Sequence, residues 1–225
     1  MTRTSSEGSA GGAATPVIEA VLARRSTREG FAPDPPTRAQ LEAIIRCGDA
    51  APSSKSARPW RFHVVTGRAL LDAVADDVDR APDAPSYVPH DPATGRPVPR
   101  WSSTVAESAA VLRAAPAAIF VESRGVFGGG RRALLAAPPE GLASALVGYG
   151  LELVGIGAAV QNVLLAAWSL GVPGVFMGDV LIAEPAIRSR LHIAGDLVGA
   201  VALGPTAHPP PPRDPRPPDD VVVWH

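Results

Sequence analysis

The uncharged stretch Leu153–Gly178, LVGIGAAVQNVLLAAWSLGVPGVFMG, is the most informative part of this sequence. Its 26 residues are enough to cross a lipid bilayer. However, two amide side chains, Gln161 and Asn162, lie in its middle, and Gly171–Gly174 (GVPG) breaks the helix after about 18 residues. Neither end carries the arginines typical of a membrane flank. We therefore predict a buried helix without a membrane span, and we expect a second subunit to supply part of its cover.

The spacing of apolar residues on either side of this stretch predicts the other elements. Helical periodicity predicts helices at 16–24, 38–50, 68–79, 103–114, 141–170 and 183–191. Short apolar runs predict strands at 62–65, 117–122 and 196–203, and a short extended piece at 175–177. Few strands among many helices in irregular order indicate an α+β fold. The terminal run Val221–Trp224 predicts a segment that pairs with a sheet edge.

Length and composition limit the class of protein. The 225 residues predict a single domain over 16–225, preceded by a Ser/Gly/Ala-rich tail at 1–15 that we expect to be disordered. Cys47 is the only cysteine, which excludes an internal disulfide and a multi-thiolate zinc site. A formal net charge of −1 provides no overall field for nucleic acid or an anionic membrane. We expect a cytoplasmic protein with neither of these partners, because the N-terminus also lacks the apolar core of a secretory signal.

Several common catalytic signatures are missing. The chain has no Gly-x-Ser-x-Gly elbow, and Lys55 is not preceded by the glycines of a phosphate loop. Gly155 and Gly157 lack the third glycine of a dinucleotide-binding turn and lie within a predicted helix. The five histidines are scattered, with no pair spaced for a metal ion. We therefore assign no metal site and no catalytic side chain.

Three short segments remain as candidates for binding anions or rings. Arg24–Arg28, RRSTR, concentrates guanidinium and hydroxyl groups that can hold a phosphate, although a solvated helix end has the same composition. Ala51–Trp60, APSSKSARPW, is a polar loop stiffened by proline that could bind a heteroring or simply connect two elements. Gly128–Arg132, GGGRR, could cradle a phosphate, but a mobile loop with solvated arginines is the favoured interpretation.

Together these motifs resemble the FMN-dependent nitroreductase family. The matching residues are Arg24–Arg28 with Phe31, Ala51–Ser54 with Pro59, Trp60 and Phe62, Ala158–Ala167 with Leu170–Val172, and Leu203–Pro205 before an arginine-bearing tail. The resemblance implies an α+β homodimer in which helices flank a sheet and a long buried helix lies at the centre. It further implies a C-terminal arm that embraces the partner subunit, and two FMN molecules at the subunit interface.

The resemblance also implies the residues that bind FMN. For the phosphate and ribityl oxygens these are Arg24, Arg25 and Ser26, helped from the tail by Arg213 or Arg216. For the ring they are Arg28 near N1 and O2, where a cation favours the reduced flavin, and Met177–Gly178 with a backbone N–H near N5. For the flavin of the other subunit they are Pro52, Ser53, Ser54 and Ser56.

The implied activity is an FMN-dependent oxidoreductase that takes hydride from NAD(P)H and reduces a nitroaromatic, quinone or related small molecule. Three alternatives remain open: a biosynthetic oxidase or dehydrogenase, a non-catalytic FMN-binding protein, and a helical interaction protein without cofactor. Where the family commonly has Asn and Gln, this chain has Ser56 and Arg58. Lys55 and Arg58 either make this loop more cationic or both point into solvent. We also predict that Tyr87, Trp101 and Phe127 contribute to the cover of the flavin.

Overall fold

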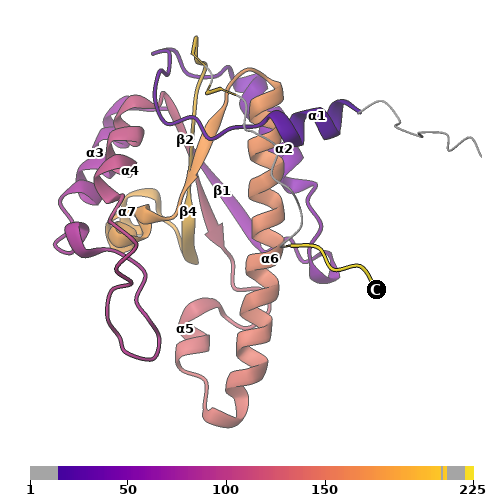
Figure 1. The fold of residues 1–225 in the computed structure, drawn as a ribbon, viewed down its shortest axis with the longest axis vertical. Coiled ribbons are helices and arrows are strands. Elements are labelled where there is room, and N and C mark those ends of the chain that lie inside the picture. Colours follow the sequence, from indigo (N-terminus) through magenta and orange to yellow (C-terminus); the bar gives the residue numbers. More distant parts are fainter. Residues whose placement is uncertain (1–14, 209, 212–220) are drawn as a thin grey trace, which may run out of the picture.

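The computed structural model describes residues 15–208, 210–211 and 221–225 (Figure 1). Of the predicted tail at 1–15 it describes only Thr15, and Arg213 and Arg216 also lie outside the described residues. Elsewhere the predicted order of helices and strands is confirmed, with boundaries that differ by a few residues.

A single antiparallel sheet has the strand order β1-β2-β4-β3. Its strands are β1 (Trp60–Val65), β2 (Ala117–Ser123), β3 (Gly174–Met177) and β4 (Asp196–Leu203). The α+β prediction is therefore confirmed. The order places β1 and β3 at opposite edges, with β2 and β4 between them.

The described helices are α1 (Pro16–Ala23), α2 (Arg38–Asp49), α3 (Arg68–Asp79), α4 (Val105–Ala114), α5 (Gly130–Leu135), α6 (Pro139–Ser169) and α7 (Glu184–Leu191). Short 3-10 turns form at η1 (Ser54–Ser56), η2 (Ala84–Ser86) and η3 (Asp179–Ala183). The prediction of a mobile loop at Gly128–Arg132 is wrong for its last part, because Gly130 begins α5. The apolar spacing gave no signal there, since α5 is only six residues long.

Helices cover both faces of the sheet. Side chains alternate along β2, so that Ala118 and Phe120 pack beneath α3, α4 and α7, while Ile119 and Val121 pack beneath α2 and α6. Figure 1 shows these two helical layers on either side of the strands. All seven residues of β2 are buried, which explains why its first five residues, Ala117–Val121, are apolar.

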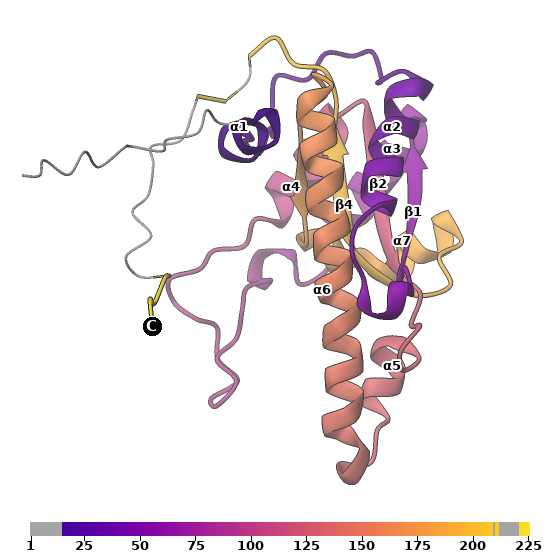
Figure 2. The same cartoon turned by 90° about the vertical axis from the view of Figure 1, so that its right-hand side faces the viewer.

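The 31-residue helix α6 confirms the predicted long central helix and is about 46 Å long. From Gly155 to Ala167 one side of it packs against α2 and the sheet. Its N-terminal half extends beyond the sheet alongside α5 (Figure 2). There Val147 is 62% exposed and Val154 is 72% exposed. The prediction of a buried helix therefore holds within one chain for the C-terminal half only.

By length and composition alone, α6 could also cross a membrane. No other helix in the described part of the chain is long and apolar enough for this. One such helix is weak evidence. Ile156 and Val163 are each 1% exposed, because they lie in the core between the sheet and α2. Since these contacts are those of a core helix, we assign α6 to the folded domain.

A buried carboxylate ties α6 to the end of β2. Glu152 is 0% exposed and accepts hydrogen bonds from the Ser123 hydroxyl at 2.8 Å and from the Phe127 backbone N–H at 2.7 Å. These two donors offset part of the cost of burying its charge. The contact fixes the loop after β2 against the middle of α6.

Candidate functional site

The first predicted binding segment, Arg24–Arg28, runs from the end of α1 to the β3 edge of the sheet. The Thr27 backbone N–H donates to the Gly174 carbonyl at 3.1 Å, so the segment is held by the backbone at the start of β3. Arg24, Arg25 and Ser26 are half-buried, whereas Arg28 is exposed. The arginines therefore lie along the edge of the sheet, not on a detached helix end.

A hollow of about 240 Å³ brings Arg28 together with Met177 and Gly178. The family resemblance implies that these residues share one site although 149 positions separate Arg28 from Met177. The structure joins them because the bond from Thr27 to Gly174 aligns the segment with β3, which ends at Met177. A guanidinium here faces a backbone that has no side chain at Gly178.

The opposite wall of this hollow carries polar residues that the sequence analysis missed. Asp179 lines the hollow, and its carboxylate accepts hydrogen bonds from the hydroxyls of Thr104 and Ser108. Both hydroxyls come from the start of α4, which packs against η3. No motif links residues 104 and 179, so only the packing of the helices could reveal this wall.

The second predicted segment, the loop before β1, has an unusual backbone. Lys55, Ser56 and Arg58 adopt positive φ angles of 52°, 52° and 48°. For residues other than glycine this left-handed conformation costs roughly 1–2 kcal/mol each. Such strain persists only where surrounding contacts enforce it, and it is concentrated at functional sites. The loop is therefore a strained segment that needs specific contacts to hold its shape, and its role in binding stays a prediction.

Asp49, at the end of α2, holds this strained loop. Its carboxylate pairs with the Arg58 guanidinium and accepts a hydrogen bond from the Trp60 indole N–H at 3.1 Å. The Ser53 hydroxyl accepts from the Arg58 backbone N–H at 3.0 Å. The hydrogen bond from Arg58 holds the pKa of Asp49 below its usual value. Arg58 is therefore neither an added free cation nor a side chain directed only at solvent, because Asp49 balances its charge.

The two segments do not meet within one chain. Arg28 and Met177 lie at the β3 edge, whereas Ser53 and Ser54 precede β1 at the other edge. Three strand spacings separate these edges, roughly 14 Å. Ser53 packs against α6, where a Cβ built on Gly155 would lie 3.3 Å from the Ser53 Cβ. Pro52 and Ser56 are exposed in the same loop.

A sequence model of the nitroreductase family matches residues 21–205, which includes both binding segments and the whole sheet. The chain belongs to the nitroreductase family. Among curated proteins it is similar to YdjA of Escherichia coli (strain K12), which is named as an NAD(P)H nitroreductase. The two are 32% identical over 121 residues, a match that covers 45% of this chain and 66%, just under two thirds, of YdjA.

Solved structures share the nitroreductase fold at lower identity. An FMN-bound nitroreductase from Desulfitobacterium hafniense DCB-2 superimposes with a TM-score of 0.66 at 21% identity, covering 94% of this chain and 99% of that one. The NADPH:FMN oxidoreductase of Vibrio harveyi, solved with NAD+, has a TM-score of 0.63 at 23% identity, covering 93% and 76%. These similarities confirm the nitroreductase-like fold.

The three aromatic residues predicted to cover the flavin lie in different places. Tyr87 is 37% exposed, and its pKa is raised by burial and by the nearby charge of Asp179. Trp101 is 53% exposed, with the Arg100 guanidinium 5.5 Å from its ring centroid. Phe127 packs over α6 at Gly148. Their role as a cover stays a prediction.

Within the described ranges no group of three or more His, Cys, Asp or Glu side chains could hold a metal ion. The terminal run at 221–225 forms no strand, and Val223 and Trp224 are 77% and 91% exposed. The predicted pairing of this run with a sheet edge therefore does not occur within the chain.

Proposed function

We propose that this protein is an FMN-dependent oxidoreductase that takes hydride from NAD(P)H and reduces a nitroaromatic, quinone or related small molecule. The observation that carries the proposal is the hollow that joins Arg28 to Met177 and Gly178. A cation beside an open backbone suits a flat ring that gains negative charge on reduction. The relatives named for NAD(P)H and FMN support the same chemistry.

The residues at this edge fit FMN. A Cβ built on Gly178 would meet nothing within 4 Å, which leaves room for a ring against the backbone. The Thr27 hydroxyl is buried and has no hydrogen-bond partner among the described residues, so a polar group remains to be satisfied. Arg24, Arg25 and Ser26 would hold the phosphate, with Arg213 or Arg216 as further candidates. FMN, when bound, supplies the hydride and electron transfer.

The chain's own residues would then position and tune the cofactor. Arg28 would stabilise negative charge at one end of the ring, while the backbone at Met177–Gly178 would orient the other. Asp179 is held by two hydroxyls and therefore has a fixed position at the wall of the hollow. No side chain is assigned as a general acid or base, and we expect protons to come from solvent.

We further propose that the functional unit is a homodimer. The loop containing Pro52, Ser53, Ser54 and Ser56 lies at the opposite sheet edge from Arg28, so a complete site needs this loop from a second copy. Apolar side chains are exposed along α1 and the first half of α6, including Leu22 at 73% and Val154 at 72%. Such patches mark interaction surfaces.

The proposal includes a single domain over 16–225, a C-terminal arm on the partner, and a cytoplasmic location.

Sedimentation of Val154→Glu tests the dimer. Placing a carboxylate on the exposed apolar face of α6 should yield monomers and abolish FMN binding, since each site would lose one half. Ala110→Glu, which places the same charge on an exposed position of α4, should remain dimeric and keep FMN. A Val154→Glu dimer that retains FMN would contradict this arrangement.

The visible absorption spectrum of the purified protein, before and after anaerobic NADH or NADPH, tests the activity. A flavin spectrum that bleaches supports the reductase and leads to a screen of nitroaromatic and quinone acceptors. A flavin spectrum that persists favours the oxidase or the non-catalytic FMN-binding protein. No flavin absorbance, even after FMN is added, overturns the proposal.

A further inference from the structure

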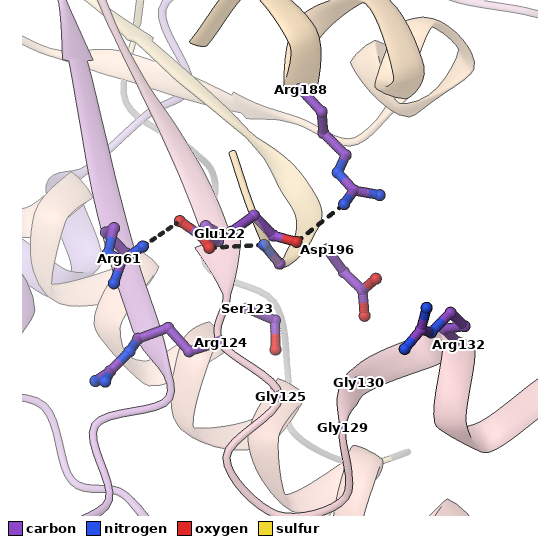
Figure 3. A pocket seen from close by; sticks show the side chains of 12 residues that line it. Arg61, Glu122, Ser123, Arg124, Gly125, Gly129, Gly130, Arg132, Arg188 and Asp196 are labelled. Atoms are coloured by element: carbon purple, nitrogen blue, oxygen red, sulfur yellow. Dashed lines mark hydrogen bonds and ion pairs between the residues drawn. The ribbon is translucent and has the colours of Figure 1, made fainter. Parts of the chain in front are cut away.

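A second hollow of about 540 Å³ lies between the end of β2, α5 and α7 (Figure 3). It shares no lining residue with the hollow at Arg28. Four arginines line it, and we call it the arginine pocket: Arg61, Arg124, Arg132 and Arg188. In Figure 3, Arg61 and Arg124 lie on one side of the pocket, and Arg132 and Arg188 on the other. Its volume is within the range of small-molecule sites.

The loop after β2 is shaped to form this pocket. Gly125, Gly129 and Gly130 have φ angles of +68°, +82° and +74°, a conformation that side chains disfavour. A Cβ on Gly130 would also lie 2.6 Å from the Asp196 carboxylate. The tight reversal brings Arg124, just before the loop, and Arg132, just after it, to the same hollow. The glycine-rich segment noted in the sequence therefore has a structural role here.

The two carboxylates that line the pocket are already occupied. Glu122 is 1% exposed and accepts from the Gly195 backbone N–H at 2.8 Å, besides contacting His63 Nε2 at 2.7 Å and Arg61 at 3.4 Å. Asp196 accepts from the Arg131 backbone N–H at 2.5 Å. Neither carboxylate forms an ion pair with another of the pocket's arginines among the described residues.

The four guanidiniums outnumber the two carboxylates, so the lining of the pocket keeps a formal net charge of +2. Arg188 donates to the carbonyls of Ile193 and Ala194 at 3.5 and 3.0 Å, and Arg124 donates to a carbonyl at 3.3 Å. Carbonyl contacts fix the orientation of these groups but do not neutralise them. The Arg132 side chain has no hydrogen bond or ion pair in the part of the chain that the structure describes, whereas its backbone carbonyl accepts from the Ala136 N–H at 3.1 Å within α5. Like charges held around one hollow repel each other unless an anion lies between them.

We propose that the arginine pocket binds a small polyanion, a molecule bearing two or more phosphate or carboxylate groups. Guanidinium groups match both kinds of oxyanion through paired, charge-assisted hydrogen bonds. The buried Glu122 carboxylate forms part of the wall and leaves Arg124, Arg132 and Arg188 to face the ligand. This site is independent of the proposed FMN chemistry.

Calorimetric titration of the purified full chain, with and without added FMN, tests the proposal with inorganic tripolyphosphate and with citrate as probes. The informative variant is Arg132→Glu, because the exposed Arg132 side chain makes no hydrogen bond or ion pair within the described residues. Arg96→Glu, an exposed arginine outside the pocket, is the matched control. Arg25→Glu reports on binding at the β3 edge, where an anion could occupy the expected phosphate position instead.

We expect at least one of the two probes to bind with the same dissociation constant to wild type, Arg96→Glu and Arg25→Glu. Arg132→Glu should bind that probe at least about tenfold more weakly. Tighter binding of tripolyphosphate assigns the pocket to phosphorylated ligands, and tighter binding of citrate assigns it to polycarboxylates. Equal binding in Arg132→Glu and wild type overturns the proposal, as does loss of binding in Arg25→Glu. So does the absence of binding of both probes at about 10 mM. A flavin spectrum in the same samples reports on the proposed function separately.

Discussion

The Arg24–Arg28 segment and the Ser53–Arg58 loop lie at opposite edges of the sheet and are stabilised in different ways. A backbone hydrogen bond from Thr27 holds the first, and none of its residues has a positive φ. The second holds three non-glycine residues in the left-handed region and depends on the side chains of Asp49 and Ser53. We therefore expect substitutions at the β3 edge to change binding without changing the fold, and substitutions in the loop before β1 to change both.

The largest effect should come from removing cations at the β3 edge. Arg25→Ala combined with Arg28→Ala should weaken FMN binding at least about 100-fold, because two charge-assisted contacts are lost. Far-UV circular dichroism should remain that of the wild type. Fluorescence titration with FMN measures the affinity, and Arg46→Ala with Arg96→Ala, two exposed arginines outside this hollow, is the control. Unchanged FMN affinity would refute the assignment of this edge.

Asp49→Ala should lower the stability of the fold, which is a smaller effect than the loss of FMN binding. The Trp60 indole N–H is buried, and leaving it without an acceptor costs about 1–3 kcal/mol. Urea denaturation measures the free energy of unfolding. Glu42→Ala removes an exposed pair with Arg38 on the same helix and should cost under about 0.5 kcal/mol. Equal effects of the two substitutions would mean that Asp49 does not hold the loop.

Relieving the backbone strain at Lys55 should make the protein more stable. Lys55→Gly should raise the free energy of unfolding by about 0.5–1 kcal/mol, because glycine adopts a φ of 52° without steric cost. Ala57→Gly in the same loop, at a φ of −74°, should lower it by about as much. Urea denaturation of both variants checks these signs. If Lys55→Gly is destabilising, the left-handed backbone carries no strain to release.

The smallest effect concerns pH. The pKa of Asp49 is held below its ordinary value of 3.8 by Arg58, so its contribution to stability is present above that pH and is lost as pH falls through the lowered pKa. The difference in urea midpoint between wild type and Asp49→Asn should be constant over about pH 5–7 and should shrink below about pH 4. A difference that is independent of pH down to 3 would exclude the charge of Asp49 as its source.

Much of the fold follows from the sequence because local patterns repeat over many residues. The apolar spacing over 68–79 and the buried run at 196–203 predicted α3 and β4 at their observed bounds. The GVPG sequence also predicted the end of α6, where Gly171 adopts a φ of +72°. By contrast, α5 is a six-residue helix with no apolar periodicity, so nothing in the pattern indicated it.

The candidate site divides in the same way. Dense clusters of charge and hydroxyl groups in the linear sequence selected Arg24–Arg28 and the Ala51–Trp60 loop, and the family resemblance added Met177–Gly178. Asp49 and Asp179 were missed, since each acts on residues that folding brings near. The sequence around a carboxylate does not indicate which distant side chain it will contact in the folded protein.

The sequence by itself therefore determined the order of the longer elements, the family resemblance and the two predicted binding segments, because these depend on local pattern and spacing. Only the tertiary structure decided that the segments lie at opposite edges of the sheet, that Asp49 balances Arg58, and that four arginines surround one hollow. These facts depend on strand order and on the packing of distant side chains, which no local spacing encodes.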